Sequence, residues 1–218
     1  MIPLGILGAA SVRVASEVDP HWSSVVSLLH FDGPNLVHDE KGKVWTVTGL
    51  PDVYTGEYKF GGASMVALSS MDRIDCIHPD FAFGTGDFTI EGWYRPDRSS
   101  NRAVFSFGPR LVYVASNNWA YFTGSNNAIV GGQMPLTIWF HVALTRHLGV
   151  VRLFINGLQA GASYPEPGAI DPGSFRIGWY NSGNAAGGLY DEFRTTKGVA
   201  RYTSNFMPPT APFPSSGL

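Results

Sequence analysis

No second acid follows Glu91 at the spacing of a glycosidase site. Retaining glycoside hydrolysis uses two carboxyl groups about 5–5.5 Å apart. On a strand, such a pair comes from acids two or four residues apart, because every second side chain points the same way. Glu91 is followed by Gly-Trp-Tyr-Arg, and Asp191 and Glu192 are adjacent, which predicts that those two face opposite ways. We therefore predict no catalytic residues and no enzyme activity.

Nucleophilic chemistry is not indicated either. His30, His141 and His147 lie in or beside expected strands, but no serine occupies a G-x-S-x-G turn. A buried structural role is the expectation for His141. Cys76, the single cysteine, has no activating neighbour and no partner for an internal disulfide, so it is expected to be an ordinary thiol.

Aromatic residues next to short amides form a candidate binding surface. Ring faces can stack on sugars, and amides donate and accept hydrogen bonds. The same residue types are enriched where subunits meet, so a subunit interface is an equal alternative. The candidate glycan-binding residues are Trp119, Tyr121, Trp179, Tyr180 and Asn181.

The elements that must position these residues are strands. From Ile138 to Gly157 the chain alternates apolar and polar residues, turns at Leu148-Gly149, and alternates again before Asn156-Gly157. Such a pattern predicts an antiparallel hairpin. Shorter alternating runs separated by Gly, Asn and Ser predict an all-β sandwich, while the proline-rich tail is expected to lie extended on its surface. The expected strands are 25–32, 43–48, 64–69, 72–77, 87–95, 103–107, 111–115, 119–123, 128–130, 138–147, 150–155, 175–180 and 188–195.

Composition narrows the classes of partner. The chain has 218 residues, 44% of them hydrophobic and 15% charged, and its formal net charge is −2. That balance argues against nucleic acid as a partner. The first ten residues, M-I-P-L-G-I-L-G-A-A, lack the basic start of a secretory signal and are too short to span a membrane. We predict that residues 1–18 are an arm that docks on other subunits, and that there is no membrane insertion.

Four segments of the sequence resemble laminin G-like domains of the concanavalin A-like lectin/glucanase superfamily. They read D-F-A-F-G-T-G-D-F-T-I-E-G-W-Y (80–94), W-F-H-V-A-L-T-R (139–146), V-R-L-F-I-N-G (151–157) and G-L-Y-D-E-F-R-T-T-K-G-V-A-R-Y (188–202). The opening at 19–33 and the close at 197–214 resemble the variant found in bacteriophage tail and other virion proteins. The resemblance implies an antiparallel jelly-roll sandwich over 19–214, with 1–18 as an N-terminal extension and 215–218 as the C-terminal end.

The same resemblance implies a function. We expect a bacteriophage virion structural protein, located on the tail or the head of the particle as a decoration or adhesion protein, with host-surface glycan as its candidate ligand. Its expected partners are other virion proteins, bound through residues 1–18, and further copies of itself, a trimer by analogy with phage fibres. A soluble carbohydrate-binding module and a glycan hydrolase of the same fold are the alternatives. Laminin G-like domains often hold a structural Ca²⁺, and its predicted ligands are Asp32 on the first strand and Asp191 on the last, which would meet if those strands are neighbours. In the alternative, Asp32 caps its turn and Asp191 or Glu192 pairs with Arg194 or another base.

Overall fold

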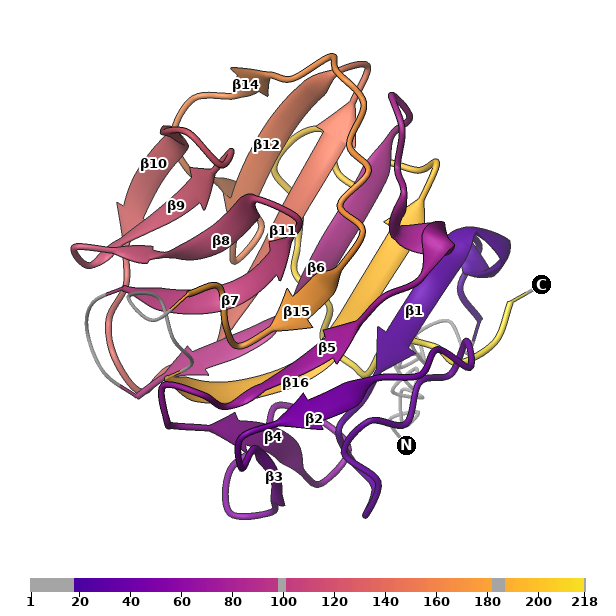
Figure 1. Ribbon diagram of the computed structural model, residues 1–218, viewed down its shortest axis with the longest axis vertical. Helices are drawn as coiled ribbons and strands as arrows, with labels where there is room; N and C mark the ends of the chain where they lie inside the picture. Colours follow the sequence, from indigo (N-terminus) through magenta and orange to yellow (C-terminus); the bar gives the residue numbers. More distant parts are fainter. Residues whose placement is uncertain (1–17, 98–100, 182–186, 218) are drawn as a thin grey trace, which may run out of the picture.

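Two antiparallel sheets packed face to face form the body of the protein in the computed structural model, which describes residues 18–97, 101–181 and 187–217 (Figure 1). The nine-stranded sheet has the order β13-β12-β11-β6-β16-β4-β3, with β1 beside β16 and β14 beside β12. Its strands are β1 (Val25–Leu29), β3 (Asp52–Tyr54), β4 (Ser64–Ala67), β6 (Phe88–Pro96), β11 (Phe140–His147), β12 (Val150–Ile155), β13 (Leu158–Gln159), β14 (Tyr164–Pro165) and β16 (Gly188–Lys197). The all-β jelly-roll prediction is confirmed.

The seven-stranded sheet has the order β10-β9-β8-β7-β15-β5-β2. Two short 3-10 helices, η1 and η2, precede β1 and β6. The bounds are β2 (Thr46–Thr48), β5 (Arg73–Cys76), β7 (Arg102–Phe107), β8 (Arg110–Ala115), β9 (Asn118–Phe122), β10 (Asn127–Gln133), β15 (Phe175–Ile177), η1 (Trp22–Ser24) and η2 (Pro79–Phe81).

The predicted central hairpin is present as β11 and β12. Its two turn residues, Leu148 and Gly149, both have positive φ, at 49° and 74°. A two-residue turn with both φ values positive matches the twist of the strands that it joins. The prediction of an edge strand at 72–77 is wrong, because β2 pairs outside β5. Cys76 faces the core and is buried. Burial raises the pKa of the Cys76 thiol to about 11, so the thiol stays protonated at neutral pH.

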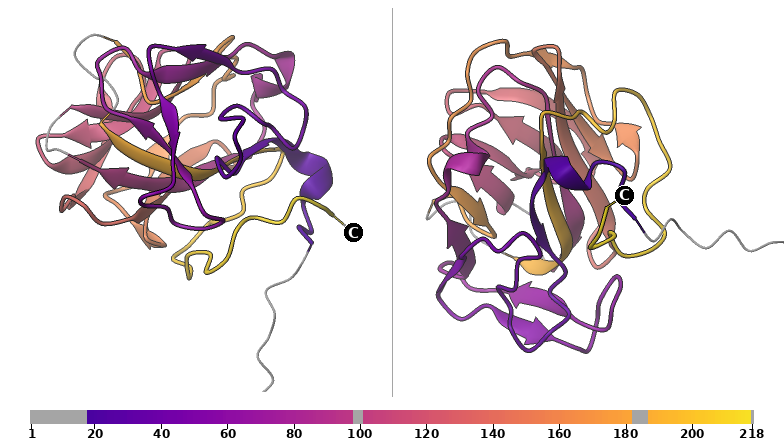
Figure 2. Two further views of the ribbon diagram at one scale, coloured as in Figure 1. Left: turned by 90° about the horizontal axis from the view of Figure 1, so that it is seen from below. Right: turned by 90° about the vertical axis from the view of Figure 1, so that its right-hand side faces the viewer.

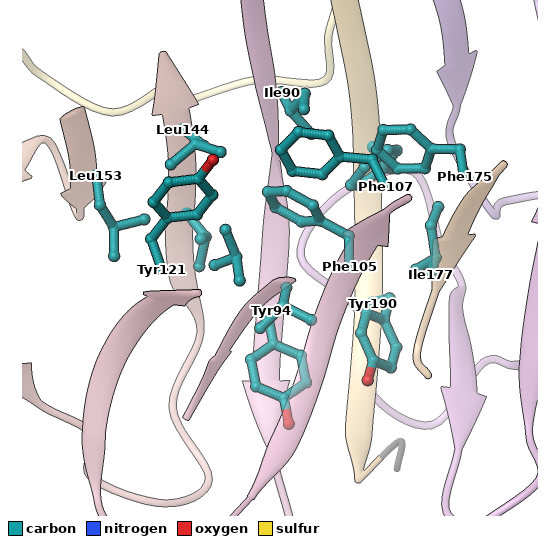
Figure 3. Packing of buried hydrophobic residues seen from close by; sticks show 14 of the residues in the cluster. Ile90, Tyr94, Phe105, Phe107, Tyr121, Leu144, Leu153, Phe175, Ile177 and Tyr190 are labelled. Atoms are coloured by element: carbon teal, nitrogen blue, oxygen red, sulfur yellow. The ribbon is translucent and has the colours of Figure 1, made fainter. Parts of the chain in front are cut away.

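Aromatic rings fill the space between the sheets (Figure 3). Phe107 stacks on Phe175 at 6.0 Å, and Tyr94 lies 4.9 Å from Tyr190 across the neighbouring strands β6 and β16. The alternation of β6 decides this arrangement, since Ile90 and Tyr94 face the core while Glu91 and Trp93 face outward.

The C-terminal tail lies over the outer face of the nine-stranded sheet (Figure 2). Phe213 is buried there, and the Phe213 amide donates to Glu192 at 2.7 Å. The two ends of the described chain also meet, because Asp19 donates its backbone N–H to Ser216 and forms a bridge with Gly217. The expected extended tail is confirmed, and its contacts continue to Gly217.

Two predictions concern the parts outside this body. The arm predicted at 1–18 lies outside the described residues except for Val18. No helix among the described residues has the length and apolar character needed to cross a membrane.

Candidate functional site

Trp119 and Tyr121 do not form a binding surface, and this part of the prediction is wrong. Both side chains lie on the inner face of β9 and are fully buried. Trp119 packs edge-on against Phe140 at 5.2 Å, and Tyr121 points toward the strands that carry Leu144 and Leu153 (Figure 3). Alternation within one strand turns residues 119 and 121 to the same side, so the polar loops that flank β9 were a misleading signal.

Trp179, Tyr180 and Asn181 do lie at the surface, on the outer face of the seven-stranded sheet. The chain leaves β15 at Gly178, whose φ of 93° is a conformation that glycine adopts readily. Ser106 on the neighbouring strand β7 then donates its hydroxyl to the Trp179 carbonyl at 2.9 Å. Residues 179 and 180 thus form a ridge across the sheet, the Trp179–Tyr180 ridge, rather than the predicted end of a strand.

A shallow pocket of about 200 Å³ lies on the Tyr180 side of this ridge. The Tyr180 ring lies 6.2 Å from the Phe122 ring in an edge-to-face arrangement, and the Tyr180 hydroxyl donates to the Pro109 carbonyl. The Tyr113 hydroxyl donates to Asn127 at 2.9 Å. The sequence prediction missed Tyr113 and Phe122, although the alternation of β8 and β9 places them on the face opposite to the core. The pocket is lined by Leu111, Tyr113, Phe122, Tyr180 and Asn181.

Trp179 lies on the other side of the ridge and has charged neighbours. The guanidinium carbons of Arg73 and Arg176 lie 4.7 and 5.4 Å from its ring centroid. Trp179 therefore supports two arginines, a role that its sequence context did not indicate.

A second polar group forms where β1 meets β16. The expected pairing of the first and last strands is confirmed, with Leu29 opposite Phe193. Asp191 accepts the backbone N–H groups of Lys59 and Phe60 through Oδ2, at 2.7 and 3.1 Å. Asp32 is exposed and accepts the Ala63 N–H at 3.4 Å. One loop, residues 59–63, thus touches both predicted metal ligands.

The prediction that Asp191 and Glu192 face opposite ways is wrong. Tyr190 and Phe193 both face the core, and the register between β16 and β6 shifts between Asp191 and Arg194. A β-bulge with Glu192 at φ 52° therefore turns two consecutive acids to the outer face.

His30 joins these acids. Its Nδ1 lies 2.7 Å from Glu192 Oε1, and ligand atoms of His30, Asp32 and Glu192 all lie within 4.8 Å of one another. His30 and Glu192 were not predicted as metal ligands. The bulge that turns Glu192 to the outer face cannot be detected from the alternation of residue types.

The acidic group formed by His30, Asp32, Asp191 and Glu192 favours the binding of protons or of a cation. Burial raises the pKa of Asp191 to about 8, and the nearby Glu192 and Asp32 add to the rise. Burial disfavours the charged form of His30, but its hydrogen bond to Glu192 and the charge of that acid raise its pKa. Asp191 is 1% exposed, and its Oδ1 is buried without a hydrogen-bond partner in the described part of the chain. An unpaired buried carboxylate oxygen is costly unless a proton or a metal ion compensates it.

Another buried acid of this face, Glu91, is fully engaged. It accepts from Arg194 at 2.7 Å and from the Tyr202 hydroxyl at 2.9 Å, and His141 Nε2 lies 3.2 Å away. Burial opposes its ionisation, but the charge of Arg194 and the nearby His141 hold the pKa of Glu91 well below its usual range. A carboxylate enclosed in this way has no oxygen directed at a substrate.

A family model and a fungal protein are both similar to this sequence. A family model described as the concanavalin A-like lectin/glucanases superfamily matches residues 71–200. The pH-response regulator protein palF/RIM8 of Emericella nidulans is 30% identical over 130 residues, which cover 53% of this chain and 16% of the fungal protein.

Solved structures share the fold at low sequence identity. Domain 4 of AbnA, a GH43 extracellular arabinanase from Geobacillus stearothermophilus in complex with arabinotriose, has a TM-score of 0.59 at 19% identity, covering 81% of this chain and 94% of that domain. The binding domain of botulinum neurotoxin DC in complex with SialylT has a TM-score of 0.61 at 13% identity, covering 82% and 49%. The Trypanosoma rangeli sialidase in complex with the inhibitor DANA has a TM-score of 0.58 at 13% identity, covering 80% and 31%.

Proposed function

This chain belongs to the laminin G-like domains of the concanavalin A-like lectin/glucanases superfamily, and from that membership we propose that it is a glycan-binding domain displayed on a bacteriophage virion. The observation that carries the binding proposal is the aromatic pocket beside Tyr180. Rings that are held by their own hydrogen bonds and open to solvent on one side suit stacking on sugars. Two proteins of the same fold were solved with arabinotriose and with SialylT, which supports the same class of ligand.

Replacing Tyr180 by alanine is expected to weaken glycan binding roughly tenfold, since loss of a ring that anchors a ligand costs on the order of 1.4 kcal/mol. The measurement is titration of the purified protein with hits from a glycan array. Tyr58→Ala is the matched control, because Tyr58 is 46% exposed and lies outside the pocket. Equal affinities of Tyr180→Ala and wild type would exclude this pocket as the binding site.

The two alternative functions, a soluble carbohydrate-binding module and a glycan hydrolase, require different features of the protein. A soluble carbohydrate-binding module would use the same pocket and differ only in where the protein resides. A glycan hydrolase would need a free acid pair, whereas Glu91 is enclosed by Arg194, Tyr202 and His141. Asp191 and Glu192 share the outer face, but both are buried. Release of reducing ends from a bacterial surface polysaccharide by the purified protein would establish the hydrolase.

Display on a virion is supported by the opening and closing segments that resemble phage virion proteins, at 19–33 and 197–214. In this proposal residues 1–18 contact other virion proteins and the protein acts as a homo-oligomer. Immunogold imaging of an intact particle tests where the protein lies on the virion. Absence of the protein from purified particles would refute display.

We also propose a structural Ca²⁺ at the β1–β16 junction. The observation in its favour is the buried Oδ1 of Asp191 beside Asp32 and Glu192, which has no hydrogen-bond partner among the described residues. Carboxylate oxygens are the ligands that Ca²⁺ prefers, and carbonyls and waters can complete its shell. In this assignment Asp32 and Asp191 bind the ion, with Glu192 as a further acid close by.

Millimolar Ca²⁺ is expected to raise the melting temperature by about 5–10 °C. This is the shift expected in a domain of this size when the free Ca²⁺ concentration is about a hundredfold above the Kd of the site. EDTA should reverse the rise, and Asp32→Ala should abolish it. Asp52→Ala, an exposed aspartate on β3, is the control that keeps the response. A wild-type melting curve that Ca²⁺ does not shift would remove the calcium proposal.

A further inference from the structure

Two arginines on neighbouring strands share one aspartate beside the ridge. Arg73 and Asp75 lie on β5, and Arg176 lies opposite Asp75 on β15. Asp75 accepts the Nε–H of each arginine at 2.8 Å, one on each carboxylate oxygen, and the Thr48 hydroxyl donates to it as well. The Asp75 oxygens are thus occupied, and the group of three keeps a net charge of +1.

The Trp179 ring holds both guanidinium groups. Their carbons lie 4.7 Å (Arg73) and 5.4 Å (Arg176) from its centroid, within the range of cation–π attraction. Their side chains are 18% and 30% exposed. Two long side chains that would be mobile on an open surface are therefore held in fixed positions and remain accessible.

The outward ends of these arginines retain donors. Each Nε is used on Asp75, which leaves the Nη groups, and of these only Arg73 Nη1 has a protein acceptor in the described part of the chain, the Met71 carbonyl at 3.4 Å. A guanidinium presents its N–H groups as a planar fork that matches the two oxygens of a carboxylate.

This arginine pair lies within reach of the aromatic pocket. Register places Arg176 opposite Ser106, and Ser106 opposite Leu111, which lines the pocket. Neighbouring strands are about 4.8 Å apart, so the backbones at Arg176 and Leu111 are separated by roughly 10 Å. Trp179 and Tyr180 are consecutive and connect the two places. One oligosaccharide can contact both.

We infer that Arg73 and Arg176 select glycans with an acidic sugar, a residue that bears a carboxylate, an inference that rests on the proposed glycan binding. The neutral part of the chain stacks in the pocket, and the carboxylate accepts from the free Nη groups. Trp179 is a positioning residue that acts through the arginines.

The experiment compares each acidic oligosaccharide with the same oligosaccharide after reduction of its carboxyl group to an alcohol. Sialylated and uronate-containing glycans serve as probes, and affinities are measured by titration. Wild type is expected to bind the acidic form at least about tenfold more tightly than the reduced form. A charge-assisted hydrogen bond between guanidinium and carboxylate that is partly shielded from water gives a difference of this size. The preference should weaken as salt is raised.

Arg176→Gln and Arg73→Gln should remove this preference and keep the affinity for the reduced form. Arg95→Gln is the matched control, because Arg95 is 24% exposed in its side chain, pairs with Glu57, and belongs to the other sheet. Equal binding of acidic and reduced forms by wild type would overturn the acidic-sugar inference and leave the proposed function standing. Absence of binding to either form by the folded protein would overturn the proposed function itself.

Discussion

Asp191→Asn is expected to make the protein more stable than wild type at pH 8.5 in EDTA, by on the order of 3–5 kcal/mol. Burial raises the pKa of Asp191 to about 8 in the folded protein, against 3.8 for an ordinary aspartate. Between these two values the folded protein keeps a proton that the unfolded chain has lost. The free energy of unfolding of wild type therefore falls as the pH rises from about 4 to about 8, and asparagine, which does not ionise, removes that fall.

Urea unfolding at pH 5, 6.5 and 8.5 measures this effect, with Asp52→Asn as the control at an exposed position. The raised pKa of His30 contributes to the pH dependence of both proteins, so the difference between them reports Asp191. Saturating Ca²⁺ should reverse the order at pH 8.5, because a bound cation stabilises the carboxylate and asparagine weakens the site. Parallel stability curves for Asp191→Asn and wild type would contradict this account of the carboxyl group.

Glu91→Gln is expected to lower the free energy of unfolding by about 3–5 kcal/mol, because it leaves buried charges without their partner. Arg194 is 5% exposed and donates to Glu91 through two nitrogens, at 3.0 and 2.7 Å. Asp19 accepts from Arg194 and from Arg201 at 2.8 and 2.7 Å, so the group also joins the start of the described chain to the tail.

The matched control is Glu57→Gln. Glu57 has a 42% exposed side chain with Arg95 at 3.7 Å, and its loss is expected to cost less than about 1 kcal/mol. The lowered pKa of Glu91 gives a second signature. Its stabilising contribution is present above an ordinary glutamate pKa of 4.5 and is lost as the pH falls, so wild type should lose more stability in acid than Glu91→Gln. Similar costs for Glu91→Gln and Glu57→Gln would contradict the stabilising role assigned to the buried charged group around Glu91.

The strand pattern could be predicted from the sequence, because alternation records which side chains face the core. The hairpin at 138–157 and the strands around Tyr94 and Tyr190 follow that rule. The three short strands β3, β13 and β14 were missed, since two or three residues are too few to show a period. Trp119 and Tyr121 were misplaced for a related reason. Their polar flanks were read as a loop, while their own spacing indicated one buried face.

The candidate site was predictable only in part. Trp179, Tyr180 and Asn181 follow the expectation of a surface position, but Arg73 and Arg176 come from strands about a hundred residues apart. The pairing of β5 with β15 brings them together, and no local pattern records that pairing. At the acidic group, the first and last strands were expected to be neighbours, which located Asp32 and Asp191. Glu192 could not be predicted as part of this group, because it reaches the outer face only through the β-bulge. That break in periodicity depends on the neighbouring strands.

Asp19 and Gly217 lie next to each other, on the side of the sandwich away from the aromatic pocket. Asp19 pairs with Arg194 on the outer face of the nine-stranded sheet, whereas the Trp179–Tyr180 ridge lies on the outer face of the opposite sheet. A carrier that held the domain close to these two residues would therefore lie behind the sandwich. The aromatic pocket and the arginines would then face away from the point of attachment, toward whatever the carrier approaches.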